Sequence, residues 1–248
     1  MKKVVAAVRM IFICVVISLY LIVVGIPVLT YCRLKRNPQL ALRLTKLLDR
    51  IILFLAGIHV EVEGKEKISG QGGYVYVGNH RSFVDVTAVF LALPGDLRFL
   101  AKKEIYKIPL VSFALRTMGI IEVDRSNPEA AAKSIDRAVG EIRSGRSIIL
   151  FPEGTRSRSP HMLPFKKGAF VLAIKAKAPI VPITLLGMAE LLRPDTLFLY
   201  PGRVKIFIHD PIETEALDLE NRTQLLDQAR AVIEETWERE RDQFSSMR

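Results

Sequence analysis

The chain has 248 residues, of which 50% are hydrophobic, so it can bury one sizeable core, and no linker rich in Pro, Gly or Ser divides it. Its 36 lysines and arginines against 26 aspartates and glutamates give a formal net charge of +10, which attracts nucleic acid, anionic lipid headgroups and phosphorylated substrates alike. The two cysteines, Cys14 and Cys32, lack the spacing of a zinc site or a disulfide framework, and no aromatic-basic stacking pattern indicates nucleic-acid binding.

The first element is an apolar segment, residues 10–30, that contains no charged residue and has basic residues on both sides. No small-x-small cleavage site follows it, which favours a membrane segment over a cleaved signal peptide. Gly25 and Pro27 interrupt it, and the roughly 15 unbroken residues, at ~1.5 Å each, fall short of a ~30 Å hydrocarbon core. Because both flanks are basic, the positive-inside rule does not orient the segment.

The next element, residues 40–55, repeats leucine and isoleucine at helical spacing, with Arg43, Lys46 and Arg50 on the opposite side. This pattern is typical of a helix at a membrane surface and equally of one packed on a core. We therefore expect residues 1–57 to form a pair of membrane-anchoring helices and residues 58–248 an α/β domain. We favour a pair embedded in the cytoplasmic leaflet of the cell membrane and held by anionic lipid, with a single span kinked at a proline as the alternative.

Strands and helices alternate in the rest of the chain. The pattern predicts strands near residues 59–62, 74–77, 97–100, 119–123, 147–151, 180–185 and 204–208. It predicts helices near residues 83–93, 109–117, 128–144, 167–176 and 222–244. Pro109 and Pro128 suit the first turns of two of these helices. The alternation predicts an α/β fold with a mixed, largely parallel sheet covered by helices.

His80 follows a predicted strand directly and lies in the turn before the next helix. Ser82 suits the N-cap, and Asp85 completes the S-x-x-D pattern of a capping box, which places a carboxylate beside the histidine. A carboxylate that accepts the imidazole N–H fixes the tautomer and leaves the other nitrogen as a base. The helix N-terminus near Ser82 is also a candidate source of N–H donors for an oxyanion. Taken alone, such a pair is more often a helix cap beside a loop histidine, so neighbouring motifs decide.

Two further polar clusters follow predicted strands: Asp124 and Arg125 after "GIIEV", and the segment "FPEGTRSR", residues 151–158, after "SIIL". Ligands of open α/β sheets bind beyond the carboxyl ends of the strands, so these loops are expected to face one site. Its candidate residues can bind a hydroxyl or an anion such as a phosphate: Lys102, Arg125, Glu153, Gly154, Thr155 and Arg156. No G-x-S-x-G, G-x-G-x-x-G or Walker A pattern is present, so neither a serine nucleophile nor a nucleotide cofactor is expected.

In this order and spacing, "NHRSFVD", "GIIEVDR", "FPEGTRSR" and "VPIT" strongly resemble the motifs of the glycerophospholipid acyltransferases, most closely the bacterial 1-acyl-glycerol-3-phosphate acyltransferases. The resemblance covers roughly residues 73–187. It implies transfer of a fatty acyl group from a thioester of acyl carrier protein or coenzyme A to the sn-2 hydroxyl of lysophosphatidate. The product would be phosphatidate, a precursor of phospholipids.

The resemblance also implies roles for single residues. On the matching positions, His80 is the general base and Asp85 orients it. The implied contacts to the glycerol phosphate are Lys102, Arg125, Glu153, Gly154, Thr155 and Arg156, and Pro182 belongs to a motif associated with acyl or acceptor binding. No metal or cofactor is implied, since the thioester is a co-substrate. Two alternatives stay open: an acyltransferase for another lyso-lipid, and a non-catalytic, membrane-tethered protein that binds anions.

Overall fold

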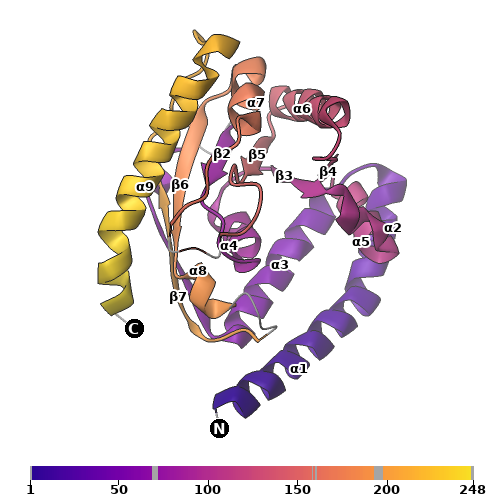
Figure 1. Ribbon diagram of the computed structural model, residues 1–248. Helices are drawn as coiled ribbons and strands as arrows, with labels where there is room; N and C mark the ends of the chain where they lie inside the picture. The colour runs from indigo at the N-terminus through magenta and orange to yellow at the C-terminus, as the bar shows by residue number, and fades with distance from the viewer. Residues whose placement is uncertain (1, 69–71, 158, 160, 193–197, 247–248) are drawn as a thin grey trace.

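The computed structural model describes residues 2–68, 72–157, 159, 161–192 and 198–246 (Figure 1). Within these residues, seven strands form one sheet in the order β1-β7-β6-β2-β5-β3-β4. In chain order the strands are β1 (Ile58–Glu63), β2 (Val75–Gly78), β3 (Leu97–Lys102), β4 (Ile121–Val123), β5 (Ser147–Leu150), β6 (Ile180–Leu186) and β7 (Gly202–Ile208).

The sheet is mixed but largely parallel. Strands β6, β2, β5, β3 and β4 are parallel to one another, whereas β7 is antiparallel to β6 and β1 is parallel to β7. The predicted α/β fold with a mixed, largely parallel sheet is therefore confirmed. Because β2, β5, β3 and β4 are adjacent and parallel, the loops that follow them leave the sheet at the same edge.

Helices pack on both faces of the sheet. They are α4 (Val84–Ala92), α5 (Pro109–Thr117), α6 (Pro128–Arg143), α7 (Gly168–Ala176), α8 (Met188–Leu191) and α9 (Arg222–Ser246). Three 3-10 turns, η2 (Lys65–Lys67), η3 (Lys103–Lys107) and η4 (Leu219–Asn221), join them within the described residues. The predicted helices are all present, and α8 was not predicted.

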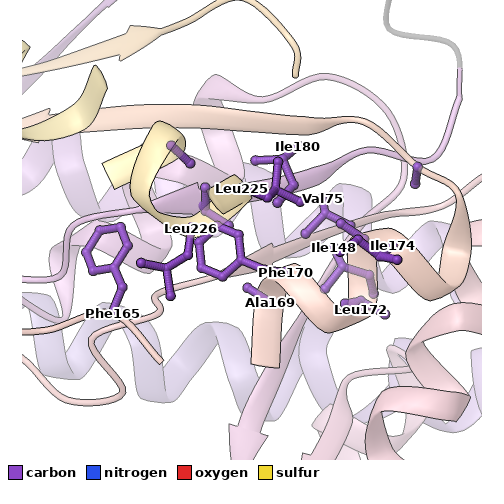
Figure 2. Packing of buried hydrophobic residues seen from close by; sticks show 14 of the residues in the cluster. Val75, Ile148, Phe165, Ala169, Phe170, Leu172, Ile174, Ile180, Leu225 and Leu226 are labelled. Carbon is purple, nitrogen blue, oxygen red and sulfur yellow. The ribbon is translucent and has the colours of Figure 1, made fainter. Parts of the chain in front are cut away.

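Two hydrophobic clusters hold these layers together. Successive strand residues point to opposite faces, so Val75 packs with α6, α7 and α9 while Tyr76 packs with α4 on the other face. Figure 2 shows the first cluster, where Phe170 of α7 lies among side chains of the sheet and of α9. Apolar side chains of the strands therefore point to both faces of the sheet, and each face is covered by helices.

The N-terminal segment is one continuous helix. Helix α1 (Lys2–Tyr20) continues through a π-helical turn, η1 (Leu21–Gly25), into α2 (Ile26–Lys35). The expectation that Gly25 and Pro27 break the helix is therefore wrong. Proline lacks an N–H and its ring clashes with the carbonyl four residues earlier, and the wider π turn just before Pro27 accommodates both effects. The stretch Val4–Lys35 is 32 residues long and contains an 18-residue window with a mean hydropathy of 2.9, so it is long and apolar enough to cross a membrane by length and composition alone.

Helix α3 (Gln39–Ala56) runs back along this helix and joins it to the sheet. The hydroxyl of Tyr20 donates to the carbonyl of Leu44 at 2.8 Å, and Arg9 Nη1 donates to the carbonyl of Ala56 at 3.4 Å, so the two helices are antiparallel (Figure 1). Ile13 is buried in the same cluster as the sheet residues. The hairpin therefore packs on the α/β domain and shares a hydrophobic cluster with it. The division of the chain at residue 57 into an anchoring part and a catalytic part remains a prediction.

Candidate active site

His80, in the loop between β2 and α4, pairs with Asp85, a buried residue in the first turn of α4. His80 Nδ1 lies 2.7 Å from Asp85 Oδ2, and the side chain of Asp85 is 0% exposed while that of His80 is 17% exposed. Because Nδ1 faces a carboxylate, Nδ1 carries the proton and Nε2 is the free base. The ring of His80 also stacks on Phe151, with centroids 4.3 Å apart and planes 13° apart. Both contacts fix the orientation of the imidazole.

The start of α4 keeps one half of the predicted capping box, the bond from the Ser82 N–H to the Asp85 carboxylate. The helix begins at Val84, and Ser82 Oγ accepts from the backbone N–H of Val84 at 3.3 Å instead of capping at Asp85. Asp85 Oδ2 accepts the backbone N–H groups of Arg81 and Ser82 at 2.6 and 2.9 Å. The N–H groups of Arg81 and Ser82 are therefore occupied and are not available to an oxyanion, so a role for this helix end as an oxyanion donor stays a prediction. These two N–H groups hold the carboxylate for the histidine instead.

Glu153 connects the loop that carries the histidine to the loop after β5. Its Oε1 accepts the backbone N–H of His80 at 2.7 Å, its Oε2 accepts that of Leu163 at 2.8 Å, and the residue is 2% exposed. The carbonyl of His80 accepts the N–H of Ser157 at 2.8 Å, which adds a second tie between the loops. Burial raises the pKa of Glu153, although its hydrogen bonds from the backbone of His80 and Leu163 oppose that shift. This geometry favours a positioning role over the predicted contact with substrate.

The predicted cations gather at the same edge of the sheet. Arg125 Nη1 donates to the carbonyl of Gly154, and the guanidinium of Arg156 lies 3.7 Å from the ring centroid of Phe83. Thr155 is exposed beside them. The structure thus brings the loops after β2, β4 and β5 together, as expected from the strand order. Arg158, which belongs to the same motif, lies outside the described residues.

The two lysines that end β3 and follow it have different surroundings. Lys102 is exposed at the carboxyl end of β3. Lys103 donates to Asp124 at 2.6 Å and to Ser126 at 3.2 Å, and the hydrogen bond from Lys103 is the main cause that lowers the pKa of Asp124 to about 2. Lys103 is therefore committed to an ion pair, which leaves Lys102 as the cation available at this strand end.

Lys166 is a candidate site residue that the sequence reasoning missed. Gly154 has a φ of +75°, and a Cβ on it would lie 3.0 Å from the Cε and Nζ atoms of Lys166. Glycine is therefore favoured at position 154 for its backbone conformation, and a Cβ there would displace the flexible end of this lysine. Lys166 adds an exposed cation beside the Arg125–Gly154 contact. The basic pair "FKK" just before α7 was the available signal, but it follows no strand.

Pro182 does not join these loops. It lies inside β6, paired in register with Val77 of β2, and it is buried. Its carbonyl accepts the N–H of His209 at 3.0 Å, at the point where pairing with β7 ends. A part for Pro182 in acyl or acceptor binding stays a prediction, and it would act by shaping the strand. Among the described residues, no group of three or more His, Cys, Asp and Glu side chains is arranged to hold a metal ion.

Comparison with known proteins identifies the family of this site. The family model described as acyltransferase matches residues 59–186, which is just over half of the chain. The chain belongs to the acyltransferase family. The matched range contains every candidate residue of the site, from the histidine pair to the proline of β6, so the family relationship covers the strand-end loops described above.

Several curated proteins that are similar to this chain are named 1-acyl-sn-glycerol-3-phosphate acyltransferase. The chain is 36% identical over 178 residues, 71% of its length, to the chloroplastic 1-acyl-sn-glycerol-3-phosphate acyltransferase BAT2 of Brassica napus, and covers 50% of that protein. It is 33% identical over 180 residues to a 1-acyl-sn-glycerol-3-phosphate acyltransferase of Borreliella burgdorferi, covering 71% of this chain and 72% of that one. The chain thus spans about half the length of the chloroplastic relatives it matches.

The fold also matches a solved structure. The crystal structure of the 1-acyl-sn-glycerophosphate acyltransferase PlsC from Thermotoga maritima superposes with a TM-score of 0.82 over 96% of this chain and 97% of that one. The two sequences are 24% identical, so this similarity establishes the fold. It extends beyond the family-model range, from the N-terminal hairpin to the C-terminal helix, because almost all of both chains is covered.

Proposed function

We propose that this protein transfers a fatty acyl group from an acyl thioester, carried by acyl carrier protein or coenzyme A, to the sn-2 hydroxyl of 1-acyl-glycerol-3-phosphate. The product is phosphatidate, for phospholipid synthesis. The observation that carries the proposal is the His80–Asp85 pair, with Nδ1 and Oδ2 2.7 Å apart, in a loop beside the Arg125 and Arg156 cations. The names of the relatives agree with this acceptor.

The reaction follows from the histidine geometry. Nε2 of His80 takes the proton of the acceptor hydroxyl as its oxygen attacks the thioester carbonyl, and the buried carboxylate of Asp85 stabilises the imidazolium that forms. When the tetrahedral intermediate collapses, the C–S bond breaks, and the leaving thiolate takes the proton from His80. General-base catalysis contributes about 10²–10⁴-fold, and positioning of the two substrates supplies much of the remainder.

The cationic loops suit the phosphate of the acceptor. Arginine forms paired hydrogen bonds with phosphate oxygens. Arg125 and Lys166 lie beside Gly154, and the guanidinium of Arg156 lies over Phe83. Phe83, on the loop of the catalytic pair, is 62% exposed and lies against Arg156. A large exposed apolar side chain next to a cation suits a substrate that has a phosphate at one end and an acyl chain at the other.

The direct test is an assay with purified protein in lipid vesicles, lysophosphatidate, and either acyl carrier protein thioester or acyl coenzyme A. We expect phosphatidate with at least one of the donors. Parallel reactions replace lysophosphatidate by other lyso-lipids, which tests the alternative acceptors. Folded, vesicle-bound protein that acylates none of these acceptors with either donor would refute the proposed function.

The cations on the loops are expected to determine acceptor affinity. Arg125→Ala and Arg156→Ala should each raise KM for lysophosphatidate by about 10- to 100-fold, since a charge-assisted hydrogen bond contributes ~1.5–3 kcal/mol. KM for the thioester should stay near the unmodified value. The matched control is Arg143→Ala, which removes an exposed arginine at the end of α6. A rise in donor KM with unchanged acceptor KM would reverse the assignment of the two substrate sites.

The N-terminal hairpin is proposed to hold the protein in the cytoplasmic leaflet of the cell membrane without crossing it. The support is an outward apolar face on the N-terminal helix. Side chains 40% to 68% exposed along it are Val4, Val5, Val8, Ile11, Phe12, Val15, Leu19, Ile22, Val23 and Ile26. The other side of this helix lies on α3, which leads directly into β1. A span that kept this packing would draw Arg43, Lys46 and Arg50 into lipid, at ~2.5–3.5 kcal/mol each at the bilayer centre.

Cysteine labelling distinguishes the leaflet anchor from a span. In a variant with Cys14→Ser and Cys32→Ala, we expect a single cysteine at position 3 or at position 35 to be shielded from a membrane-impermeant maleimide added to spheroplasts, and labelled after lysis. Both positions are then on the inner side, because both ends of the helix lie in the same leaflet. Labelling from outside at position 3 alone would establish a span.

A further inference from the structure

A basic cavity lies at the opposite edge of the sheet from the histidine. It has a volume of about 640 Å³ and is bounded by the turn of the N-terminal hairpin, the end of α5 and the amino ends of β3 and β5. Its lining includes five arginines: Arg33, Arg36, Arg98, Arg116 and Arg146. The active-site loops follow the carboxyl ends of the same strands, so this cavity is separate from them.

Two buried donors in the cavity wall have no partner in the described part of the chain. Arg98 is 1% exposed, and its Nη atoms bond Asp96 and the carbonyl of Leu97, but its Nε has no acceptor. The hydroxyl of Thr117, 8% exposed, is also unpaired. Buried donors without acceptors are costly and rare in native proteins. The wall of the cavity therefore contains two donors that the described protein leaves unsatisfied.

Gly119 keeps this space open. Its φ is +72°, and a Cβ at this position would lie 3.0 Å from Nε of Arg98. The residue lines the cavity beside the unpaired donor. A side chain at this position would therefore crowd the Arg98 guanidinium at the wall of the cavity.

Only some of the arginines that line the cavity are paired with carboxylates of the protein. Arg146 pairs with Asp96 and Glu141, and Arg116 pairs with Glu122. No ion pair is formed by Arg33 or Arg36 within the described residues. Helices α2, α5 and α6 end here, but several of their last carbonyls already accept N–H groups of the following residues, for example from Asn37, Ile120 and Arg146. The arginines are therefore not needed as caps.

We propose that this cavity binds the phosphate group of an anionic ligand and that the bound phosphate ties the hairpin turn to the sheet. Arg33 lies in the last turn of α2 and Arg36 is the C-cap of that helix, whereas Arg98, Arg116 and Arg146 come from the domain, so one phosphate contacted from both sides links them. Leu34, 78% exposed, lines the cavity on the same helix end. If the hairpin lies in the leaflet, as the proposed function has it, a lipid headgroup is the nearest source of phosphate.

The experiment measures local hydrogen exchange in the full chain, without thioester or lysophosphatidate, so that it is independent of catalysis. The probes are inorganic phosphate in detergent, vesicles of phosphatidylglycerol with phosphatidylcholine, and vesicles of phosphatidylcholine alone. We expect the anionic vesicles to slow exchange in residues 31–38 and 116–120 more than the neutral vesicles do. Protection by inorganic phosphate as well would identify a soluble anion as a further source, and protection by anionic vesicles alone would identify a headgroup.

Matched variants separate the cavity from general charge. Arg33→Gln with Arg36→Gln should weaken the protecting effect at least ~10-fold in ligand concentration, because two phosphate contacts are lost. Lys35→Gln removes a charge from the same helix end outside the cavity lining, and it should behave like the unmodified protein. Arg125→Ala controls for phosphate bound at the catalytic loops. Absence of protection with either anionic probe, or an equal loss in Lys35→Gln, would overturn the proposal.

Discussion

Replacing His80 with alanine is expected to reduce acyl transfer by at least ~10²–10⁴-fold, which in most assays is complete loss. The side chain is the only candidate base that the described loops place against a buried carboxylate, with Nδ1 2.7 Å from Asp85. Asp85→Asn should cost somewhat less, because the imidazole remains but its tautomer and its cation are less well stabilised. The measurement is phosphatidate formation at saturating donor and acceptor.

The fold of the histidine variant should be retained. The loop ties of His80 use its backbone N–H and carbonyl, which bond Glu153 and Ser157 and are unchanged by the substitution. Thermal unfolding and vesicle binding therefore check that lost activity is chemical. The matched control is His161→Ala, which removes an exposed histidine from the loop after β5. Turnover close to normal in His80→Ala would rule out the proposed mechanism.

The sheet was predictable because its strands have distinct local patterns. Short apolar runs such as Ser147–Leu150 are bounded by turn residues, and the segments between them have helical spacing and clear starts, as at Pro109 and Pro128. The position of the site was also predictable, because ligands of open α/β sheets bind in the loops that follow the carboxyl ends of parallel strands. That rule predicts from the sequence that the loops of His80 and Arg125 lie at one edge of the sheet.

The remaining differences come from tertiary contacts that no local pattern contains. Pro27 was expected to end a helix, but the π turn upstream removes the clash and the helix is supported along its length by α3. Ser82 was expected to form a capping box with Asp85. Its N–H does bond the carboxylate, but its hydroxyl bonds the N–H of Val84, and the same carboxylate oxygen also contacts the histidine. Such departures from a local rule are expected at functional sites.

The arginine-lined cavity also depends on tertiary contacts that no local sequence pattern shows. Its five arginines are separated in sequence, from Arg33 at the hairpin turn to Arg146 before β5, and each resembles an ordinary surface charge in its own segment. Only the packing of the hairpin against the sheet edge brings them together. The unpaired Nε of Arg98 depends on that packing too, because burial and not residue type makes an unpaired donor significant.

Replacing Glu153 with alanine is expected to lower both stability and turnover. The substitution leaves the backbone N–H groups of His80 and Leu163 without their acceptor, at ~1–3 kcal/mol for each group that stays buried. Loss of the tie also lets the His80 peptide move, and a displacement of about 1 Å at a reacting group can cost about 10²-fold in rate. Glu153→Gln keeps one acceptor oxygen, so its effects should be intermediate.

The measurement pairs thermal unfolding with kcat and KM at a temperature well below both transitions. Thr214→Val is the matched control, since it removes a buried hydroxyl that donates to the carbonyl of Ala178 at 2.8 Å, at the amino end of β6 and away from the catalytic loops. The control should lose stability and keep kcat. Glu153→Ala should lose both, with acceptor KM little changed, because the carboxylate acts through the histidine. A rise in acceptor KM alone would instead establish the direct substrate contact that the family motif implies.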